Sequence, residues 1–431
     1  MLRIVYTLCF ALATPIILAR LWWRGRKEIG YRQHIGERFG RYSKPAQPKL
    51  KDAIWIHAVS VGEVRAAAPL IKACEKQFPS QPILLTCMTP TGRAMATELF
   101  STCATIAYLP YDFPVAIRRL ITHFKPRCLL IMETEIWFNV VATCRAENVP
   151  VLLINARLSE RSRAGYAKLA PIRALVGEAL RCMNVVAAQS VDDAARFTSL
   201  GAKNVVVTGN MKFDFVPDEA LVAQGKAWRA ALPSSKKNVL LVASSREGEE
   251  AMLLAAYTRI FNEAARSSTL LVIVPRHPQR FDEVAALIKA AGLSLARRSE
   301  FSASPINSDT QVWLGDSMGE MSAYYALCDV AIIGGSFAKL GGQNLIEAAA
   351  LSKPTIVGEH VFNFSDAVRL GKEAGAVLQV ADAEAAMCAA IGLLEDGAVK
   401  INMEECAMKF AQAHRGATEE AVALIWLALK Q

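Results

Sequence analysis

The chain has 431 residues, 53% of them hydrophobic, which is enough for two domains of about 200 residues each. The net charge is +9, and residues 1–51 carry all of the excess, with eleven Lys and Arg against two Glu. The rest of the chain holds 38 basic and 38 acidic residues. Nucleic-acid-binding proteins usually carry their positive charge on the folded domain, so nucleic acid is not an expected partner.

The N-terminus is apolar. Sixteen uncharged residues lie between Arg3 and Arg20, followed by Leu21-Trp22-Trp23. As a helix the segment would span about 24 Å, short for a bilayer core unless the arginines snorkel and the tryptophans sit at the interface.

A cleaved signal peptide is the alternative interpretation. It is disfavoured because Leu-Trp-Trp and the basic residues Arg24, Arg26 and Lys27 stand where a small-residue cleavage site should follow. We predict a membrane anchor over 1–27. Anionic membrane lipids are its expected partners, and the positive-inside rule places the body on the cytoplasmic face of the membrane.

The ten cysteines are scattered, and none forms a C-x-x-C pair. Most lie in apolar runs, which indicates small core residues in a reducing compartment. Neither a disulfide nor a metal site is predicted.

Both halves of the chain alternate short apolar strands with helical patterns, which predicts parallel, doubly wound sheets. The expected strands are 54–58, 83–87, 128–132, 151–155, 185–188, 205–208, 239–243, 270–274, 312–314, 330–333, 355–357 and 377–380. Two Rossmann-like domains are the outline of a GT-B glycosyltransferase, with ligands in the cleft at the carboxyl ends of the strands.

Composition changes around Pro217 and Pro233, where the run Ser-Ser-Lys-Lys also occurs. We predict an N-terminal domain over 28–215, a linker over 216–237, and a C-terminal domain over 238–431 that includes the terminal helix.

The first candidate catalytic residue is Glu63, in the S-V-G-E segment after the first strand. A carboxylate at a strand-to-helix turn opens toward the cleft and could deprotonate an acceptor hydroxyl. The S-x-x-E spacing also fits a capping box of Ser60 and Glu63. Both interpretations stay open, although Gly62 favours a tight functional turn.

Two further candidates follow later strands of the first half. Glu133 lies in M-E-T-E-I-W, at the expected carboxyl edge of the sheet, and the alternative is a helix start that prefers acids. Lys212 lies in G-N-M-K-F-D, where it could neutralise a phosphate or an acidic sugar, although a lone lysine is usually a surface residue.

In the second half, three segments follow strands and suit an anionic nucleotide. Pro275-Arg276 offers a guanidinium that can grip phosphate, and the segment 315–320 opens a helix. Residues 331–354 combine two Gly-Gly pairs with Asn344 at a helix start, although Asn344 and Glu347 also have capping spacing. No two aspartates occur at i, i+2, so helix ends and cations rather than a divalent metal are expected to stabilise the leaving group.

These motifs, in this order, resemble the Kdo transferases, which move 3-deoxy-D-manno-octulosonic acid (Kdo) from CMP-Kdo to a lipid A precursor in Gram-negative bacteria. The resemblance covers nearly the whole chain. It rests on GERFG, SVGE, TPTG, LPYD, METE, NARLS, GNMKFD, VPRHP, GDSMGE and the Gly-Gly-x-Asn loop.

The resemblance implies a GT-B fold and an inverting transfer to the primary hydroxyl of the acceptor, lipid IVA, without bound metal or covalent intermediate. It implies that Glu63 is the general base, and that Glu133 and Lys212 stabilise the transition state. The residues that match CMP-binding segments are Pro275, Arg276, Met318, Gly319, Glu320, Asn344, Leu345, Ile346 and Glu347.

The chain departs from the common pattern at Gln343 and Arg246, where many members have His, and at Phe138, where they have Pro. These changes bear on fine positioning. The alternative functions are a GT-B enzyme acting on a UDP-sugar and a non-catalytic, membrane-anchored scaffold. A comparison of CMP and UDP binding, or the effect of Glu63→Ala, would distinguish them.

Overall fold

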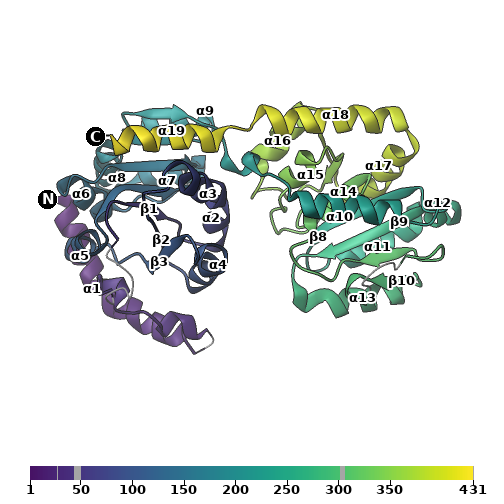
Figure 1. The fold of residues 1–431 in the computed structure, drawn as a ribbon, viewed down its shortest axis with the longest axis horizontal. Helices are drawn as coiled ribbons and strands as arrows, with labels where there is room; N and C mark the ends of the chain where they lie inside the picture. The colour runs from purple at the N-terminus through teal and green to yellow at the C-terminus, as the bar shows by residue number, and fades with distance from the viewer. Residues whose placement is uncertain (27, 43–49, 301–305, 431) are drawn as a thin grey trace. The chain divides into compact units, whose positions relative to one another are not determined.

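The computed structural model describes residues 1–26, 28–42, 50–300 and 306–430, and it divides the chain into two compact units. Unit 1 comprises Met1–Asp214 and His414–Gln431, and unit 2 comprises Phe215–Ala413. Figure 1 shows a parallel sheet with helices on both faces in each unit. Lys27, part of the predicted basic flank, lies outside the described residues.

The sheet of unit 1 has the strand order β3-β2-β1-β4-β5-β6-β7, and all its pairings are parallel. Its strands are β1 (Ala53–His57), β2 (Ile83–Cys87), β3 (Ala104–Tyr108), β4 (Pro126–Met132), β5 (Val151–Ala156), β6 (Val185–Ala188) and β7 (Val205–Val207). Its helices are α1 (Leu2–Arg24), α2 (Val61–Ala66), α3 (Ala68–Gln77), α4 (Pro90–Phe100), α5 (Pro114–Phe124), α6 (Phe138–Ala146), α7 (Glu160–Lys168), α8 (Ala170–Cys182), α9 (Val191–Ser199) and α19 (Ala417–Leu429), with 3-10 turns η1 (Ile29–Arg32), η2 (Glu37–Phe39) and η3 (Met211–Asp214).

The sheet of unit 2 has the order β10-β11-β9-β8-β12-β13-β14, again parallel. Its strands are β8 (Asn238–Ser245), β9 (Thr269–Pro275), β10 (Leu295–Arg297), β11 (Val312–Leu314), β12 (Val330–Ile333), β13 (Thr355–Val357) and β14 (Val377–Gln379). Its helices are α10 (Glu219–Ala230), α11 (Glu249–Ile260), α12 (Glu263–Ser268), α13 (Phe281–Ala290), α14 (Met321–Leu327), α15 (Ile346–Ala350), α16 (Ser365–Glu373), α17 (Ala383–Glu395) and α18 (Gly397–Ala413), with 3-10 turns η4 (Pro278–Arg280) and η5 (Arg298–Glu300).

Side-chain alternation along each strand builds a core on both faces of the unit 1 sheet. Trp55 of β1 packs with α5, α6, α8 and α9, whereas its neighbours Ile54 and Ile56 pack on the opposite face. That second face is covered by α2, α3, α4 and α19, whose residues Ala421 and Ile425 are buried there. The C-terminal helix therefore completes a core of unit 1.

The domain boundaries differ from the predicted ones at two places. The expected linker 216–237 contains α10, which Asp218 caps and which belongs to unit 2. Gly225 of α10 packs so closely on Ala323 of α14 that a side chain there would meet the Ala323 carbonyl. The terminal helix, predicted with the second domain, belongs to unit 1 because its apolar face completes that core.

Candidate active site

The carboxyl edge of the unit 1 sheet has its switch point between β1 and β4, where strand order runs outward in opposite directions. In open α/β sheets the loops diverge at such a point and leave a crevice for ligands. The loop after β1 leads to Glu63, and the turn after β4 carries Glu133 and Glu135. Sheet topology thus brings together acids that are about seventy residues apart in sequence.

Glu63 lies in the first turn of α2, and its Oε2 accepts the backbone N–H of Val59 at 2.7 Å. Burial, together with the nearby carboxylates of Glu133 and Glu135, raises the pKa of the Glu63 carboxyl to about 8, against the opposing effect of that hydrogen bond. Ser60 makes no side-chain capping bond to α2, so the capping box that was the alternative to a catalytic role does not form. A carboxyl with a pKa near neutrality suits proton transfer.

Gly62 does not make the tight turn expected for it. It lies within α2, it has no positive φ, and a Cβ added there would meet nothing nearer than the Ser60 hydroxyl at 3.9 Å. The glycine therefore leaves open space beside Glu63.

The T-P-T-G motif supports the loop that leads to Glu63. The Thr89 hydroxyl donates to the Val59 carbonyl at 3.3 Å and accepts the Gly92 N–H at 3.0 Å. A Cβ on Gly92 would lie 2.8 Å from that hydroxyl and 3.2 Å from the Val59 carbonyl. The motif thus packs the start of α4 against the loop.

Glu133 is the residue after β4, and its φ of +59° is left-handed, a conformation that costs about 1–3 kcal/mol outside glycine. Its backbone N–H donates to the Ile154 carbonyl at 3.0 Å, and its carbonyl accepts the Arg157 N–H at 3.2 Å, both in β5 and the residues after it. The next helix, α6, begins at Phe138 and has no acid in its first turn, so the helix-start alternative is wrong. The strained turn holds Glu133 at the sheet edge.

Lys212 lies in η3, and its Nζ is 3.9 Å from Oε1 of Glu133. The buried side chain of Asn155, at the end of β5, accepts the N–H of Met211 at 3.1 Å and so ties η3 to the same edge. The three residues predicted to be catalytic therefore lie together in unit 1.

The predicted donor-binding residues lie on unit 2, where the switch point falls between β8 and β12. Pro275 ends β9, and the N–H of Arg276 donates to the Ser245 carbonyl at the end of β8, at 2.9 Å. Met318–Glu320 follow β11, and the glycine loop follows β12. The strand order β11-β9-β8-β12 places all of these segments along one carboxyl edge.

Within that edge, Gly319 has a φ of +84° and open space around its Cβ position, and Met318 is exposed. The Glu320 carboxylate is engaged: it accepts Arg298 Nη2 at 2.9 Å and the Ser317 hydroxyl. This turn therefore offers backbone and an apolar side chain, while Glu320 braces it.

Not every glycine of the loop after β12 is there to admit a ligand. Gly335, Gly341 and Gly342 have positive φ, but Gly334 does not, and a Cβ there would lie 2.5 Å from the Ser244 carbonyl. Close packing of the loops after β8 and β12 therefore explains Gly334.

Asn344 combines the two roles considered for it only in part. Its Oδ1 accepts the Ile346 N–H at 3.1 Å and its Nδ2 donates to Glu347 at 3.0 Å, so Asn344 supports the start of α15, although the N-cap of that helix is Leu345 and not Asn344. The helix that follows, α15, has only five residues, and its dipole is correspondingly weak. Any anion binding here would depend on side chains and loop amides.

Sequence reasoning missed Glu249. Its fully buried carboxylate accepts the N–H groups of Gly335 at 2.6 Å, Phe337 at 2.9 Å and Arg246 at 2.9 Å. It therefore fixes the glycine loop against the loop after β8. The only signal in the sequence was an acid in a helix's first turn, which many helices share.

All three departures from the family pattern have visible contacts. Arg246 Nε donates to Glu247 at 3.1 Å, and the amide of Gln343 lies beside Gly335. Phe138 packs edge-on against Tyr6 of α1, with ring centroids 5.0 Å apart.

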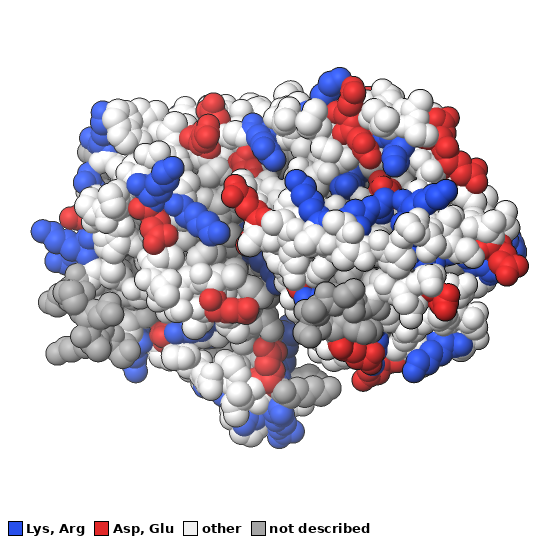
Figure 2. Space-filling view, turned by 45° about the vertical axis from the view of Figure 1, so that its right-hand side comes forward, with Lys and Arg blue, Asp and Glu red and all other residues white. Residues whose placement is uncertain are grey.

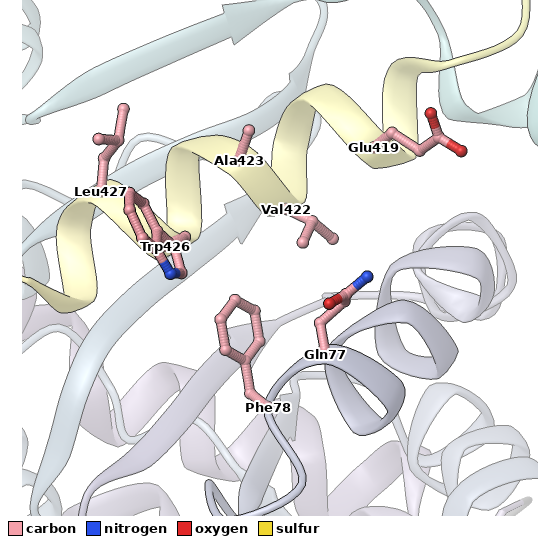
Figure 3. A pocket seen from close by; sticks show the side chains of 7 residues that line it. All are labelled: Gln77, Phe78, Glu419, Val422, Ala423, Trp426 and Leu427. Atoms are coloured by element: carbon pink, nitrogen blue, oxygen red, sulfur yellow. The ribbon is translucent and has the colours of Figure 1, made fainter.

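Surface charge and cavities add little to these sites. Figure 2 shows basic and acidic side chains interspersed over the face it presents, as expected for a body without net charge. A groove of about 550 Å³ between the end of α3 and α19 is lined by apolar residues such as Phe78 and Trp426 (Figure 3). It lies at the C-terminal end of α3, away from the Glu63 loop.

Comparisons with known proteins identify the family. A family model for 3-deoxy-D-manno-octulosonic-acid transferase (kdotransferase) matches residues 33–215. The 3-deoxy-D-manno-octulosonic acid transferase of Bordetella pertussis is 44% identical, covering 97% of this chain and 98% of that protein. The Haemophilus influenzae transferase is 34% identical, covering 99% and 98%.

Among solved structures, UDP-GlcNAc 2-epimerase from Neisseria meningitidis bound to UDP-GlcNAc superimposes with a TM-score of 0.59. It is 16% identical and covers 87% of this chain and 99% of its own, a likeness that concerns the fold alone. The two-domain GT-B fold predicted from the sequence is confirmed. The chain belongs to the family of Kdo transferases, glycosyltransferases of lipopolysaccharide biosynthesis.

Proposed function

We propose that the enzyme transfers Kdo from CMP-Kdo to the primary hydroxyl of lipid IVA with inversion at the anomeric carbon, and that Glu63 is the general base. The observation that carries this proposal is the position of Glu63 at the switch point of unit 1, with a pKa raised to about 8 beside Glu133 and Lys212. In the proposed step the acceptor oxygen bonds to the anomeric carbon as the bond to the CMP phosphate breaks. The hydroxyl proton passes to Glu63, and CMP leaves with the bonding electrons.

Glu133 and Lys212 would stabilise the transition state. The Lys212 ammonium supplies positive charge where the phosphate and the Kdo carboxylate concentrate negative charge, and Glu133 opposes the positive charge of an oxocarbenium-like sugar. Their spacing of 3.9 Å supports a shared role, because each orients the other.

On unit 2, Pro275, Arg276, Met318–Glu320 and Asn344–Glu347 would hold CMP. Loop amides and the Arg276 guanidinium suit a phosphate, and the open turn at Gly319 leaves room for a planar base. We propose that no metal takes part, which a transfer assay in a chelator would test.

We further propose that α1 attaches the enzyme to the cytoplasmic face of the inner membrane, next to anionic lipids. By length and composition Leu2–Arg24 could cross a membrane, with a mean hydropathy of 1.9. Arg20, Arg24 and Arg26 at its C-terminal end would favour anionic headgroups.

The test is incubation of purified full-length enzyme with CMP-Kdo and lipid IVA, followed by mass spectrometry of the lipid. One or more added Kdo units are expected with the native enzyme, and Glu63→Gln is expected to lower the rate at least a thousandfold while CMP binding stays within twofold. Preferential binding of UDP over CMP, or transfer by Glu63→Gln at the native rate, would contradict the proposal.

A further inference from the structure

Helix α1 presents two different faces along its whole length. One face is partly buried at helical spacing, at positions 3, 6, 7, 10, 13, 14, 17, 18 and 21, and the helix contacts α6, α8 and η1. The opposite face is exposed and apolar, with Ile4, Leu8, Leu12 and Ile16 at four-residue intervals; Leu12 is 80% exposed. A free spanning helix would have no reason to differ between its faces in this way.

Polar contacts fix the start of α1 to unit 1. Arg3 Nη1 pairs with Glu178 of α8 at 3.0 Å, and the Tyr6 hydroxyl donates to the buried Asp112 carboxylate at 2.9 Å. The Asn139 amide donates to the Thr7 hydroxyl at 2.9 Å. Asp112 also accepts the N–H groups of Asn139 and Val140, so the residue that caps α6 also holds α1.

Ring contacts continue this attachment. Tyr6 packs on Phe138, and Phe10 packs on Phe113 with centroids 5.2 Å apart. Phe113 and Phe138 stand at the starts of α5 and α6, which follow β3 and β4. The first half of α1 therefore lies on loops at the carboxyl edge of the sheet.

The chain after α1 returns to the same edge. Arg32 donates to the Trp22 carbonyl at 2.9 Å, and Gly30 lies against Pro90 at the start of α4. Glu37 then accepts the Tyr108 N–H at 2.8 Å and pairs with Arg93. Both ends of α1 are thus held by one folded unit.

We infer that α1 lies in the plane of one leaflet as part of unit 1, and does not cross the bilayer. A crossing helix would put residues 6–10 and residues 30–37 on opposite sides of the membrane, yet both contact the same edge of one sheet. The exposed stripe would enter the acyl region by about 5–10 Å. Trp23, 66% exposed, and Arg20 and Arg24 would meet an anionic headgroup layer.

The inference deepens the proposed function and rests on its membrane attachment, not on its chemistry. Because α1 covers loops of the edge that carries Glu63 and Glu133, an in-plane helix holds that edge at the headgroup layer. The acceptor's sugar could then reach the carboxylates while its acyl chains stay in the leaflet.

The decisive test is protease accessibility of tags at both termini of the full-length protein in a Gram-negative host. With α1 in the plane, both tags are digested in inside-out inner-membrane vesicles and both are protected in intact spheroplasts. Digestion of the N-terminal tag in spheroplasts, with the C-terminal tag protected, would show a crossing helix and overturn the inference.

A second measurement keeps the inference testable if a tag perturbs insertion. Nitroxides at Ile4→Cys and Leu12→Cys, each in a background with the exposed Cys9 and Cys388 changed to Ser, report depth in vesicles of phosphatidylethanolamine and phosphatidylglycerol. An in-plane helix gives both labels the same depth within a few ångströms, whereas a crossing helix separates them by about 12 Å. A crossing result with normal Kdo transfer refutes the inference alone, and an in-plane result without transfer refutes the proposed chemistry alone.

Discussion

The carboxylate of Glu249 accepts the backbone N–H of Gly335 at 2.6 Å, and this bond joins a helix start to the glycine loop of unit 2. The same carboxylate accepts Phe337 and Arg246, so one buried acid sets the shape of both loops at the unit 2 switch point. The loop amides are thereby held in place before any nucleotide arrives, which reduces the ordering cost of binding.

Glu249→Ala should therefore weaken CMP binding at least tenfold, measured by isothermal titration calorimetry. The buried N–H of Gly335 would lose its acceptor, at about 1–3 kcal/mol, and the partly buried N–H groups of Phe337 and Arg246 would lose theirs, so thermal stability should fall as well. Glu247→Ala is the matched control. The Glu247 side chain is half-exposed, and its carboxylate pairs with the side chain of the adjacent Arg246. Equal CMP affinity in both variants would show that the loop keeps its shape without Glu249.

The raised pKa of Glu63 predicts a pH dependence of transfer. The base must be ionised, so kcat/KM should rise tenfold per pH unit below about 8 and level off above it. In Glu63→Gln the residual kcat/KM should not show this rise with pH. A wild-type profile flat from pH 6 to 9 would argue against Glu63 as the titrating base.

The same pKa shift affects stability. The folded state holds the Glu63 proton more tightly than the unfolded chain does, and this tighter binding adds to the free energy of unfolding. The added stability is fully present below the pKa of Glu63 in the unfolded chain and is lost as pH rises through about 8. Glu63→Gln should thus match the wild-type melting temperature near pH 5 and exceed it at pH 9. Differential scanning calorimetry at the two pH values measures this, and a lower value for the variant at pH 9 would contradict it.

Much of this site follows from the sequence because strand ends in a parallel sheet share an edge, so Glu63, Glu133 and Lys212 could be placed from their motifs. What sequence patterns missed depends on tertiary packing. The strands β3 and β10 were not predicted; β10 is short, and β3 is only half-buried at its start, so their apolar signal is weak. The role of Glu249 and the docking of α19 on unit 1 depend on contacts between segments far apart in sequence.

A substitution at Gly62 tests whether the acceptor needs the open space next to Glu63. Alanine there fits the helix and should leave stability equal or slightly raised, by up to about 1 kcal/mol. The added methyl group would intrude where the acceptor must approach Glu63, so transfer to lipid IVA should fall at least tenfold while CMP binding is unchanged. Gly165→Ala in α7 is the control, since nothing lies within 4 Å of its Cβ position. Full activity in Gly62→Ala would place the acceptor elsewhere.

The pair formed by Lys212 and Glu133 should act as a unit. Lys212→Met and Glu133→Gln should each lower kcat by a hundredfold or more, and the double variant should lose much less than the product of the two. A double-mutant cycle on kcat measures this coupling, with the exposed Lys203→Met as the control for lost charge. Strict additivity would mean that the two groups stabilise the reaction independently.

Asp214 joins the G-N-M-K-F-D segment to the C-terminal helix, because its carboxylate accepts the N–H groups of Gly416 at 2.7 Å and Thr418 at 2.6 Å. Phe213 of the same segment stacks on His414, with ring centroids 4.9 Å apart. Asp214→Ala should cost about 0.5–2 kcal/mol, as for other lost helix caps, and should speed hydrogen exchange across α19. Since Lys212 shares η3 with Asp214, transfer should also fall. Asp218→Ala, which removes the cap of α10 in unit 2, should raise exchange in α10 and leave α19 protected. If α19 exchanges equally slowly in both variants, apolar packing alone holds it, and the cap does not couple the terminal helix to Lys212.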